Sequence, residues 1–411
     1  MRTAPQPSGR AITLRPISSE EHLRFLAAHP AASFMQNPQW ALVKKEWDGF
    51  SLGLFRHGDD GAEALAGTAL VLGRRLPVPR RTPVLGRRRL AYIPEGPILD
   101  EARISWHEAL PALTEHLSQA GAFLVRMGLP GHLRRWGAEE VRHALASAEK
   151  EQDAPQDVSA LPPAWEGPHM LRTRQQLLDL GWREPEPSTD FEAGQPQFAA
   201  SIPLTTRTED GAEEALTSDE VLGRMSSTSK RQTRKSARSE LTVLDSADGD
   251  VSERLSEFQR LYEATASSQG FIPRPAEYFR RMHDAMNRGG LSECRVLCAH
   301  FEGQPLAAAV YLRQGDFGFY AYGASSHEER KRYAPRLLQL HQVELALAAG
   351  CRWYGLGGVS PSLEAGSPAR GLLEFKTTMG ADVVQSLGEW DYQVSPALAK
   401  VFSLYMASRS V

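Results

Sequence analysis

Cysteine and long apolar runs are the scarcest features of this 411-residue sequence. Its three cysteines, Cys294, Cys298 and Cys351, fit neither the spacing of a zinc site nor a disulfide framework, so we expect three buried small hydrophobic side chains. No apolar run approaches the roughly 20 residues of a membrane-spanning helix, and residues 1–16 lack the apolar core of a signal peptide. We therefore expect a cytoplasmic protein.

A strong charge imbalance and the common nucleotide-binding motifs are also missing. The net charge is −3, so any contact with nucleic acid has to come from a local basic patch. The run Gly355-Leu-Gly-Gly358 lacks the spacing of a dinucleotide fingerprint, and the sequence has no Walker phosphate loop. The composition, 41% hydrophobic and 24% charged, is typical of a globular protein, and the length predicts about two to three domains.

The first half of the chain alternates between strand and helix signals. Strands are expected at 12–17, 50–55, 64–72, 89–93 and 123–127, and helices at 18–29, 38–47 and 104–120. The polar, proline-bearing residues 146–168 predict an exposed excursion. A helix at 171–180 and a strand at 197–204 are then expected to close this half, and the acidic, aperiodic residues 205–217 to form a linker.

The second half repeats this alternation. Helices are expected at 218–225, 227–238, 252–266, 275–286 and 332–349, and strands at 241–244, 295–301, 306–313, 317–323 and 353–356. An apolar turn carrying Lys376 follows and ends at a helix stop, Gly380. A β-type segment at 383–394 and a helix at 396–408 complete the chain.

Both halves therefore have helices, an antiparallel meander, a crossover helix and a further strand, an α/β pattern. This is the plan of an N-acetyltransferase-like (GNAT-like) domain used twice. We expect one such subdomain at 1–205, a linker at 206–217 and a second subdomain at 218–389, with residues 390–411 packing back on the first. The segment Ser325 to Pro335, where acyl-CoA-binding members of that fold carry a glycine-bearing loop, contains no glycine.

Four short motifs, spread over most of the chain, are informative in their order and spacing. They are Gln36-Asn-Pro-Gln-Trp-Ala-Leu-Val-Lys44, Tyr92-Ile-Pro-Glu-Gly-Pro-Ile-Leu-Asp100, Arg274-Pro-Ala-Glu-Tyr-Phe279, and Glu374-Phe-Lys376 with Gly388-Glu-Trp-Asp391. Together they resemble the Fem (FemXAB) family, the aminoacyl-tRNA-dependent transferases that build peptidoglycan interpeptide bridges. The resemblance runs from about residue 30 to the C-terminus and is strongest to the actinobacterial type.

The resemblance implies two GNAT-like subdomains around a central cleft, with a lipid-linked or nucleotide-linked muropeptide (lipid II or UDP-MurNAc-pentapeptide) on one side and aminoacyl-tRNA on the other. A stem-peptide amine would attack the aminoacyl ester and form an amide. Because that ester is already activated, the reaction implies no metal and no cofactor beyond aminoacyl-tRNA as co-substrate. We further expect a monomer, with peripheral contact to the inner membrane face.

Four residues match family positions on the muropeptide side. Lys44 would contact the substrate diphosphate, with a solvated helix lysine as the alternative. Arg274 precedes Pro275 in an extended connection, where a guanidinium can bind phosphate oxygens in bidentate fashion, or instead form a helix-capping salt bridge. Tyr278 and Tyr322 would line the muropeptide site, or serve as core aromatics.

Lys376 and Phe375 match the family residues at the reacting end. A cation there could hold the tRNA acceptor phosphate or stabilise the tetrahedral oxyanion. Many family members carry an Arg-x-Asp-Pro strand end, whereas this chain has Arg126-Met-Gly-Leu-Pro130, so no carboxylate base is expected at that place. We favour proton transfer through substrate or water, with Glu374 or Asp391 as the alternative base.

Two basic segments are candidates for contact with polyanions. Lys230, Arg231, Arg234 and Lys235 share one broad helix face that could meet tRNA phosphates or be merely solvated. The arginine-rich segment 74–89 could meet tRNA or anionic lipid, or be a plain surface loop. The long helical arm of some relatives has no room between residues 245 and 290.

Three rival functions remain open at this point. The same tRNA-dependent chemistry could act on a natural-product peptide or amino sugar. An acyl-CoA N-acyltransferase is disfavoured by the missing loop. A non-catalytic tRNA- or lipid-binding protein is the third.

Overall fold

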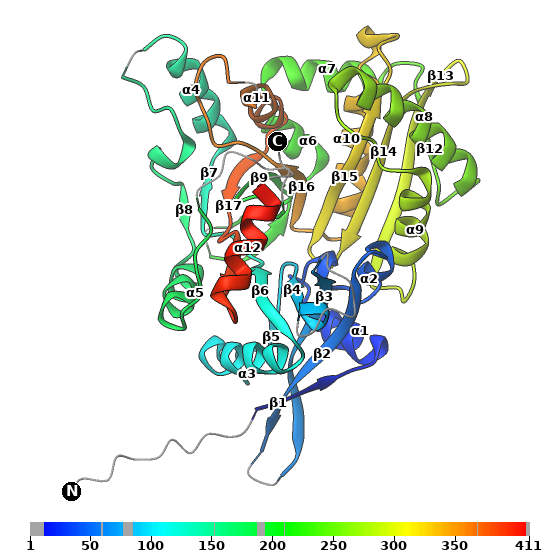
Figure 1. Ribbon diagram of the computed structural model, residues 1–411. Helices are drawn as coiled ribbons and strands as arrows, with labels where there is room; N and C mark the ends of the chain where they lie inside the picture. The colour runs from blue at the N-terminus through cyan, green and yellow to red at the C-terminus, as the bar shows by residue number, and fades with distance from the viewer. Residues whose placement is uncertain are drawn as a thin grey trace, which may run out of the picture.

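The computed structural model of the 411-residue chain describes residues 12–58, 61–76, 85–151, 153–186, 194–208, 210–367 and 369–407. Its strands form two large sheets that lie one above the other, as Figure 1 shows, with helices on their outer faces. Across the described residues, none of the helices combines the length and apolar character that crossing a bilayer requires. All three cysteines are buried, which confirms the expectation from the sequence.

The lower, seven-stranded sheet is built mainly from the first third of the chain. Its strand order is β1 (Ile12–Pro16), β2 (Asp48–His57), β3 (Glu63–Arg75), β4 (Arg89–Ile93), β6 (Ala122–Gly128) and β18 (Glu389–Tyr392), with β5 (Ile98–Leu99) paired to β3. The associated helices are α1 (Ser19–Ala27), α2 (Trp40–Val43) and α3 (Trp106–Gln119). Strands β1 to β4 form an antiparallel meander, and α3 connects β4 to its parallel neighbour β6.

The upper sheet has nine strands. Their order is β12 (Thr242–Asp245), β13 (Ser292–Phe301), β14 (Gln304–Gln314), β15 (Phe317–Ser325), β16 (Trp353–Gly358), β9 (Phe198–Pro203), β17 (Asp382–Gln385), β7 (Arg134–Trp136) and β8 (Trp165–Glu166). Its helices are α4 (Ala138–Ala148), α6 (Ser218–Gly223), α7 (Ser227–Ala237), α8 (Val251–Gln269), α9 (Ala276–Met286), α10 (Ala334–Ala348) and α11 (Arg370–Thr378). Helices α5 (Pro168–Asp179) and α12 (Pro396–Ala407) lie nearer the lower sheet.

The plan of the lower sheet recurs in the upper one. Strands β12 to β15 are an antiparallel meander, and α10 connects β15 to its parallel neighbour β16. The parallel pair is hydrogen-bonded only at its start, where Phe317, Gly318 and Phe319 face Trp353, Tyr354 and Gly355, and the strands separate beyond it. This confirms the predicted fold of two GNAT-like units, and α8 and α9 are two ordinary helices where a long arm would stand.

The two sheets do not divide the chain where the sequence suggested. The strand expected at 197–204 to close the first half is β9, which lies inside the upper sheet between β16 and β17. The expected linker contains a two-stranded hairpin, β10 (Thr205–Arg207) with β11 (Glu213–Ala215). Most described residues between 150 and 168 are exposed, in line with the expected excursion, but Val158 is fully buried and its amide donates to the Pro361 carbonyl, which fixes the segment to the upper unit.

The single β-type segment expected at 383–394 is two strands in different sheets. Strand β17 pairs with β9 in the upper sheet, and β18 pairs with β6 in the lower one. Helix α12 then contacts β6, so the last residues of the described chain return to the first subdomain as predicted. The chain between β17 and β18 therefore ties the two sheets together.

A shared apolar cluster and a few buried polar side chains fix the seam between the sheets. Phe34, Trp40 and Val43 pack in one cluster with residues of α8 and α9. The Asn37 amide donates to Ser292 Oγ (3.1 Å) and to Gln314 Oε1 (3.0 Å), both in the upper sheet. The start of the Gln36 to Lys44 motif is thus structural, since it holds the two units in register.

Candidate functional site

The four residues predicted for the muropeptide side lie in one cluster. Lys44 follows directly after α2, whose four residues are far fewer than the helix expected at 38–47. Its Nζ lies 5.7 Å from the centre of the Tyr278 ring, and the Arg274 guanidinium carbon lies 4.7 Å from the same ring. The Tyr322 hydroxyl donates to the Tyr278 hydroxyl at 3.3 Å. Segments more than 200 residues apart therefore meet here.

The charges at the centre of this cluster are positive, and the carboxylate whose charge acts on Lys44 is the exposed Glu46, which forms no ion pair with either cation of the cluster. Neither Lys44 nor Arg274 forms an ion pair with a carboxylate of the described chain, which argues against a helix-capping salt bridge at Arg274. Burial, reinforced by the neighbouring Arg274 charge, lowers the pKa of Lys44 to about 8. Burial opposes the charge of Arg274, but the Tyr322 and Tyr278 hydroxyls beside it raise its pKa on balance. Two adjacent unpaired cations over tyrosine hydroxyls are suited to binding an anion with several oxygens.

Lys376 and Phe375 point in different directions from α11. The Lys376 side chain is buried, with 7% of its surface exposed, and its Nζ donates to the Gly358 carbonyl oxygen at 2.8 Å. Burial lowers the pKa of this lysine to about 8. Phe375 is 41% exposed. Gly380 has a φ of +86°, a left-handed conformation just beyond the end of α11, as expected for a helix stop.

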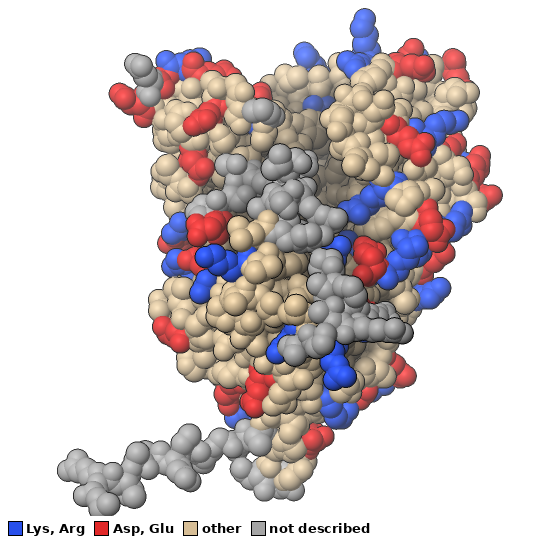
Figure 2. Space-filling model, in the orientation of Figure 1, with Lys and Arg blue, Asp and Glu red and all other residues tan. Residues whose placement is uncertain are grey.

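Phe375 forms one wall of a pocket just beyond the end of β15. The pocket has a volume of about 290 Å³ and lies at the N-terminal end of α10. The Arg336 guanidinium lies 5.8 Å from the Phe375 ring centre, and the Lys235 ammonium lies 5.5 Å from the ring of Tyr333. In Figure 2, lysine and arginine side chains project at the upper edge of the molecule, over the segment between β15 and α10.

The basic helix α7 lies near this pocket, because its Lys235 is next to the lining residue Tyr333. Its Ser229, Thr233 and Ser236 side chains are buried, on the side of the helix that contacts α10. Arg231, Arg234 and Lys235 are exposed and Lys230 is half-buried, and Arg234 also pairs with Asp219 at 3.2 Å. The predicted tRNA-binding residues thus share one side of the molecule with Phe375. They do not join the cluster around Arg274.

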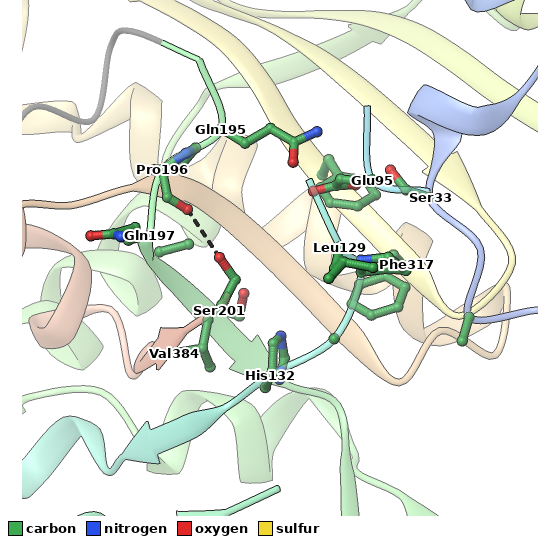
Figure 3. Close-up of a pocket in the computed structure, with 16 residues that line it drawn as sticks. Ser33, Glu95, Leu129, His132, Gln195, Pro196, Gln197, Ser201, Phe317 and Val384 are labelled. Carbon is green, nitrogen blue, oxygen red and sulfur yellow. Dashed lines mark hydrogen bonds between the residues drawn. The ribbon is translucent and has the colours of Figure 1, made fainter. Parts of the chain in front are cut away.

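A second cavity lies between the two sheets. Its volume is about 130 Å³, and its walls come from both units. Figure 3 shows Glu95 and Ser33 on one side of it and His132 and Ser201 across from them, with Leu129 and Phe317 beneath Glu95 and above His132 in this view. The Ser386 hydroxyl donates to the Pro196 carbonyl at 3.3 Å at the rim.

Glu95 is the functional candidate that sequence reasoning missed. The sequence indicated that no carboxylate stands where relatives have the aspartate of Arg-x-Asp-Pro, and Gly128 does occupy that place. A Cβ on Gly128 would lie 1.5 Å from Gln195 Oε1, so the Gln195 side chain fills the space of the absent aspartate. The neighbouring loop brings Glu95 to the same region, since the Gly96 amide donates to the Gly128 carbonyl at 2.8 Å. Glu95 belongs to the motif Tyr92 to Asp100, but the spacing of that motif does not predict that its side chain points into the cavity.

The two alternative bases are less suited to that role. Arg126 holds Asp391 through two hydrogen bonds of 2.7 and 2.8 Å, and it also lies 3.8 Å from Glu389. Glu389 accepts a 2.6 Å hydrogen bond from Tyr92, so these residues connect β4, β6 and β18. Glu374 is exposed on α11. Asp391 therefore forms a structural ion pair with Arg126.

Two sheets with the same plan, which enclose a cavity between the two units, define a tandem GNAT-like protein. Within this class, the chain belongs to the FemAB family, whose family model matches residues 17–292 and 291–406. The family predicted from the four motifs is thereby confirmed, while the actinobacterial branch stays a prediction.

Three relatives illustrate the similarity. A lipid II:glycine glycyltransferase of Staphylococcus aureus is 22% identical, with 93% of this chain and 96% of that protein covered. A UDP-N-acetylmuramoylpentapeptide-lysine N(6)-alanyltransferase of Weissella viridescens is 31% identical over 149 residues, which is 36% of this chain and 42% of that protein. The crystal structure of FemX superimposes with a TM-score of 0.69 at 20% identity, covering 95% of this chain and 99% of the other, and so supports the fold.

Proposed function

We propose that the protein transfers an amino acid from aminoacyl-tRNA to an amine of a peptidoglycan precursor, either lipid II or UDP-MurNAc-pentapeptide. Membership of the FemAB family supports the chemistry. The choice of substrate rests on Lys44 and Arg274, two cations near the Tyr278 ring that form no ion pair with a carboxylate of the described chain. Both precursors contain a diphosphate, which these two cations could bind. That pair also argues against the rival natural-product acceptor, which would not need a diphosphate site.

The reaction is an acyl transfer between oxygen and nitrogen. The neutral acceptor amine attacks the ester carbonyl carbon, so that a C–N bond forms and a tetrahedral oxyanion develops. The C–O bond to the terminal ribose then breaks, the ribose oxygen leaves as a hydroxyl, and the proton lost by the amine balances the one it gains. No nucleotide triphosphate is consumed, and we expect neither a metal nor a further cofactor.

We assign Lys376 to the reacting end, together with Phe375. The Lys376 ammonium has three N–H donors, of which one binds the Gly358 carbonyl. The remaining donors are free for an acceptor-stem phosphate or for the oxyanion. These two roles differ in kinetics: loss of a phosphate contact raises the KM for aminoacyl-tRNA, whereas loss of an oxyanion donor lowers kcat.

We assign the pocket beside Phe375 and helix α7 to the charged end of tRNA. Phosphate contacts from exposed lysine and arginine give affinity without base specificity, and stacking on Phe375 or Tyr333 suits an unpaired 3′ end. Lys230, Arg231, Arg234 and Lys235 are the proposed phosphate contacts.

We also propose that the protein works as a monomer in the cytoplasm, in peripheral contact with the membrane that carries lipid II. On α12, Val401 and Leu404 are 63% and 65% exposed. The arginine-rich segment 74–89, part of which is outside the described residues, is close by through Leu76, which packs with α12. Apolar side chains beside arginines are suited to an anionic lipid surface.

Transfer of radiolabel tests the proposal. The protein is incubated with tRNA charged with labelled glycine, alanine or serine, and with lipid II or UDP-MurNAc-pentapeptide. We expect label in the muropeptide that disappears when the tRNA is digested with RNase beforehand. If no charged tRNA gives RNase-sensitive label in either precursor, the proposed function is wrong. Label from acetyl-CoA instead would support the acyl-CoA rival.

A further inference from the structure

The cavity between the sheets is lined by polar side chains from both units. Glu95 and Ser33 come from the lower unit, whereas Ser201 lies on β9 of the upper sheet and Gln195 leads into that strand. Apolar side chains such as Phe319 complete the walls. A cavity with a few convergent polar groups on apolar walls is the usual form of a small-ligand site.

The backbone holds the Glu95 side chain in the cavity. Glu95 has a φ of +45°, a left-handed conformation that costs free energy for a residue with a Cβ. The loop is fixed on both sides of it, because the Pro94 carbonyl accepts from Gln36 and the Gly96 amide donates to Gly128. A Cβ on Gly96 would lie 2.4 Å from the Gln36 side chain, so the loop is closely packed.

The Glu95 carboxyl has no cationic partner within the described parts of the chain. Its one side-chain hydrogen-bond partner is Ser33, and burial raises its pKa in spite of that bond. The nearby Tyr92 hydroxyl is committed to Glu389. Burial, assisted by the Arg135 charge, lowers the pKa of His132 to about 4, so this imidazole is neutral at pH 7. The cavity thus offers acceptors and a potential negative charge, and its described lining residues include no lysine or arginine.

A primary ammonium group is the complement of such a lining. It carries three N–H donors and one positive charge, which a carboxylate, a neutral imidazole nitrogen and a hydroxyl oxygen can accept together. A phosphate or carboxylate would be repelled by Glu95. The volume of about 130 Å³ is suited to a small group such as a substituted amine.

We propose that this cavity binds a primary ammonium group of a substrate, with Glu95 as its counter-ion. The inference rests on the proposed function, in which both substrates carry such a group: the acceptor amine of the stem peptide and the α-amine of the aminoacyl ester. The location agrees with either source. Ala199, in the cavity wall, pairs with Gly358, whose carbonyl binds Lys376. Phe319, which also lines the cavity, lies on β15 with Tyr322.

Binding can be measured without turnover. The full chain is titrated at pH 7 with alaninamide, which carries an α-ammonium, and with lactamide, which has a hydroxyl in its place. The readout is the NMR signal of the His132 ring, assigned by its loss in His132→Gln. We expect alaninamide to shift this signal and lactamide to leave it unchanged. Equal responses to the two amides, or none to either, would overturn the proposal; a folded variant is needed only to assign the signal.

Glu95→Gln then tests the counter-ion. It keeps the shape of the side chain and removes the charge, so alaninamide should bind about tenfold more weakly or worse. Glu302→Gln is the matched control, because Glu302 is an exposed glutamate with a similar φ of +48° in the turn after β13. Undiminished binding by a folded Glu95→Gln protein would contradict the assignment.

Kinetics of Glu95→Gln distinguish the two sources. If the cavity binds the acceptor amine, the KM for the muropeptide rises and that for aminoacyl-tRNA stays constant. If it binds the aminoacyl α-amine, the KM for alanyl-tRNA rises and the preference for alanyl-tRNA over lactyl-tRNA decreases. Unchanged values of both KM would contradict the proposal. Absence of transfer by the wild-type protein would instead count against the proposed function and leave the amide titration as the test of the cavity.

Discussion

Replacing Arg274 by alanine should separate the two substrates of the proposed reaction. Arg274 pairs with no carboxylate of the described chain and much of its surface is exposed, so the fold should tolerate the change with the loss of its contacts to Tyr278 and Tyr322. Charge-assisted hydrogen bonds are worth about 1.5–3 kcal/mol, which corresponds to a rise of roughly 10- to 100-fold in the KM for a diphosphate-bearing precursor.

Lys44 moderates this loss in a pH-dependent way. The Arg274 charge helps to lower the pKa of Lys44 to about 8, so its removal lets that pKa rise. Below pH 7, Lys44 is charged in both proteins and the full penalty should appear. Near pH 8.5 the wild-type Lys44 has lost much of its charge while the variant keeps it, so the ratio of the two KM values should be smaller.

The assay measures three substrates, two acceptors and one donor, with the Arg274→Ala protein. Arg288→Ala is the control, because Arg288 is an exposed arginine just beyond α9. KM is measured for UDP-MurNAc-pentapeptide, for the free stem peptide and for aminoacyl-tRNA. We expect only the first to change, and only at Arg274. Equal increases for the nucleotide-linked precursor and for aminoacyl-tRNA would refute the assignment of Arg274 to the muropeptide side.

Three further predictions concern the charged groups. The KM for the diphosphate precursor should rise as pH increases through about 8, where Lys44 loses the proton that binds phosphate, and a flat profile from pH 7 to 9 would exclude this role. Lys376→Met should lower transfer about 100-fold if an oxyanion donor is lost, with the Gly358 carbonyl left unpaired at a cost of about 1–3 kcal/mol in stability; wild-type turnover would remove Lys376 from the mechanism. Arg231→Glu with Lys235→Glu should raise the KM for aminoacyl-tRNA and flatten its salt dependence, and an unaltered salt dependence would speak against this helix as the tRNA surface.

Local signals in the sequence predicted the elements of the fold well. The meander from β12 to β15 and the two parallel crossovers follow from alternating apolar residues, turn residues and capping boxes, which act over a few residues. The grouping of Lys44 with Arg274 came from the family resemblance instead, because no local pattern relates residues so far apart. Its geometry agrees with that expectation, while the roles of the individual residues stay predictions.

Sheet membership could not be predicted from local signals. An apolar strand such as β9 carries a pattern that specifies burial, and the same pattern suits either sheet. The turn between β17 and β18 sends one β-type segment into two sheets, a choice that depends on long-range pairing with β9 and β6. The exposure of Glu95 to the cavity likewise depends on a left-handed backbone angle and on a loop more than 30 residues away.

Mass spectrometry of the muropeptide product tests the central claim most directly. The protein is incubated with UDP-MurNAc-pentapeptide or lipid II and a mixture of charged tRNAs, and the product is fragmented to locate any added mass. The account predicts an increment of one or more amino-acid residues, attached through an amide to an amine of the stem peptide, and present only when charged tRNA is supplied. An unmodified precursor, or the same increment formed from free amino acid without tRNA, would contradict it.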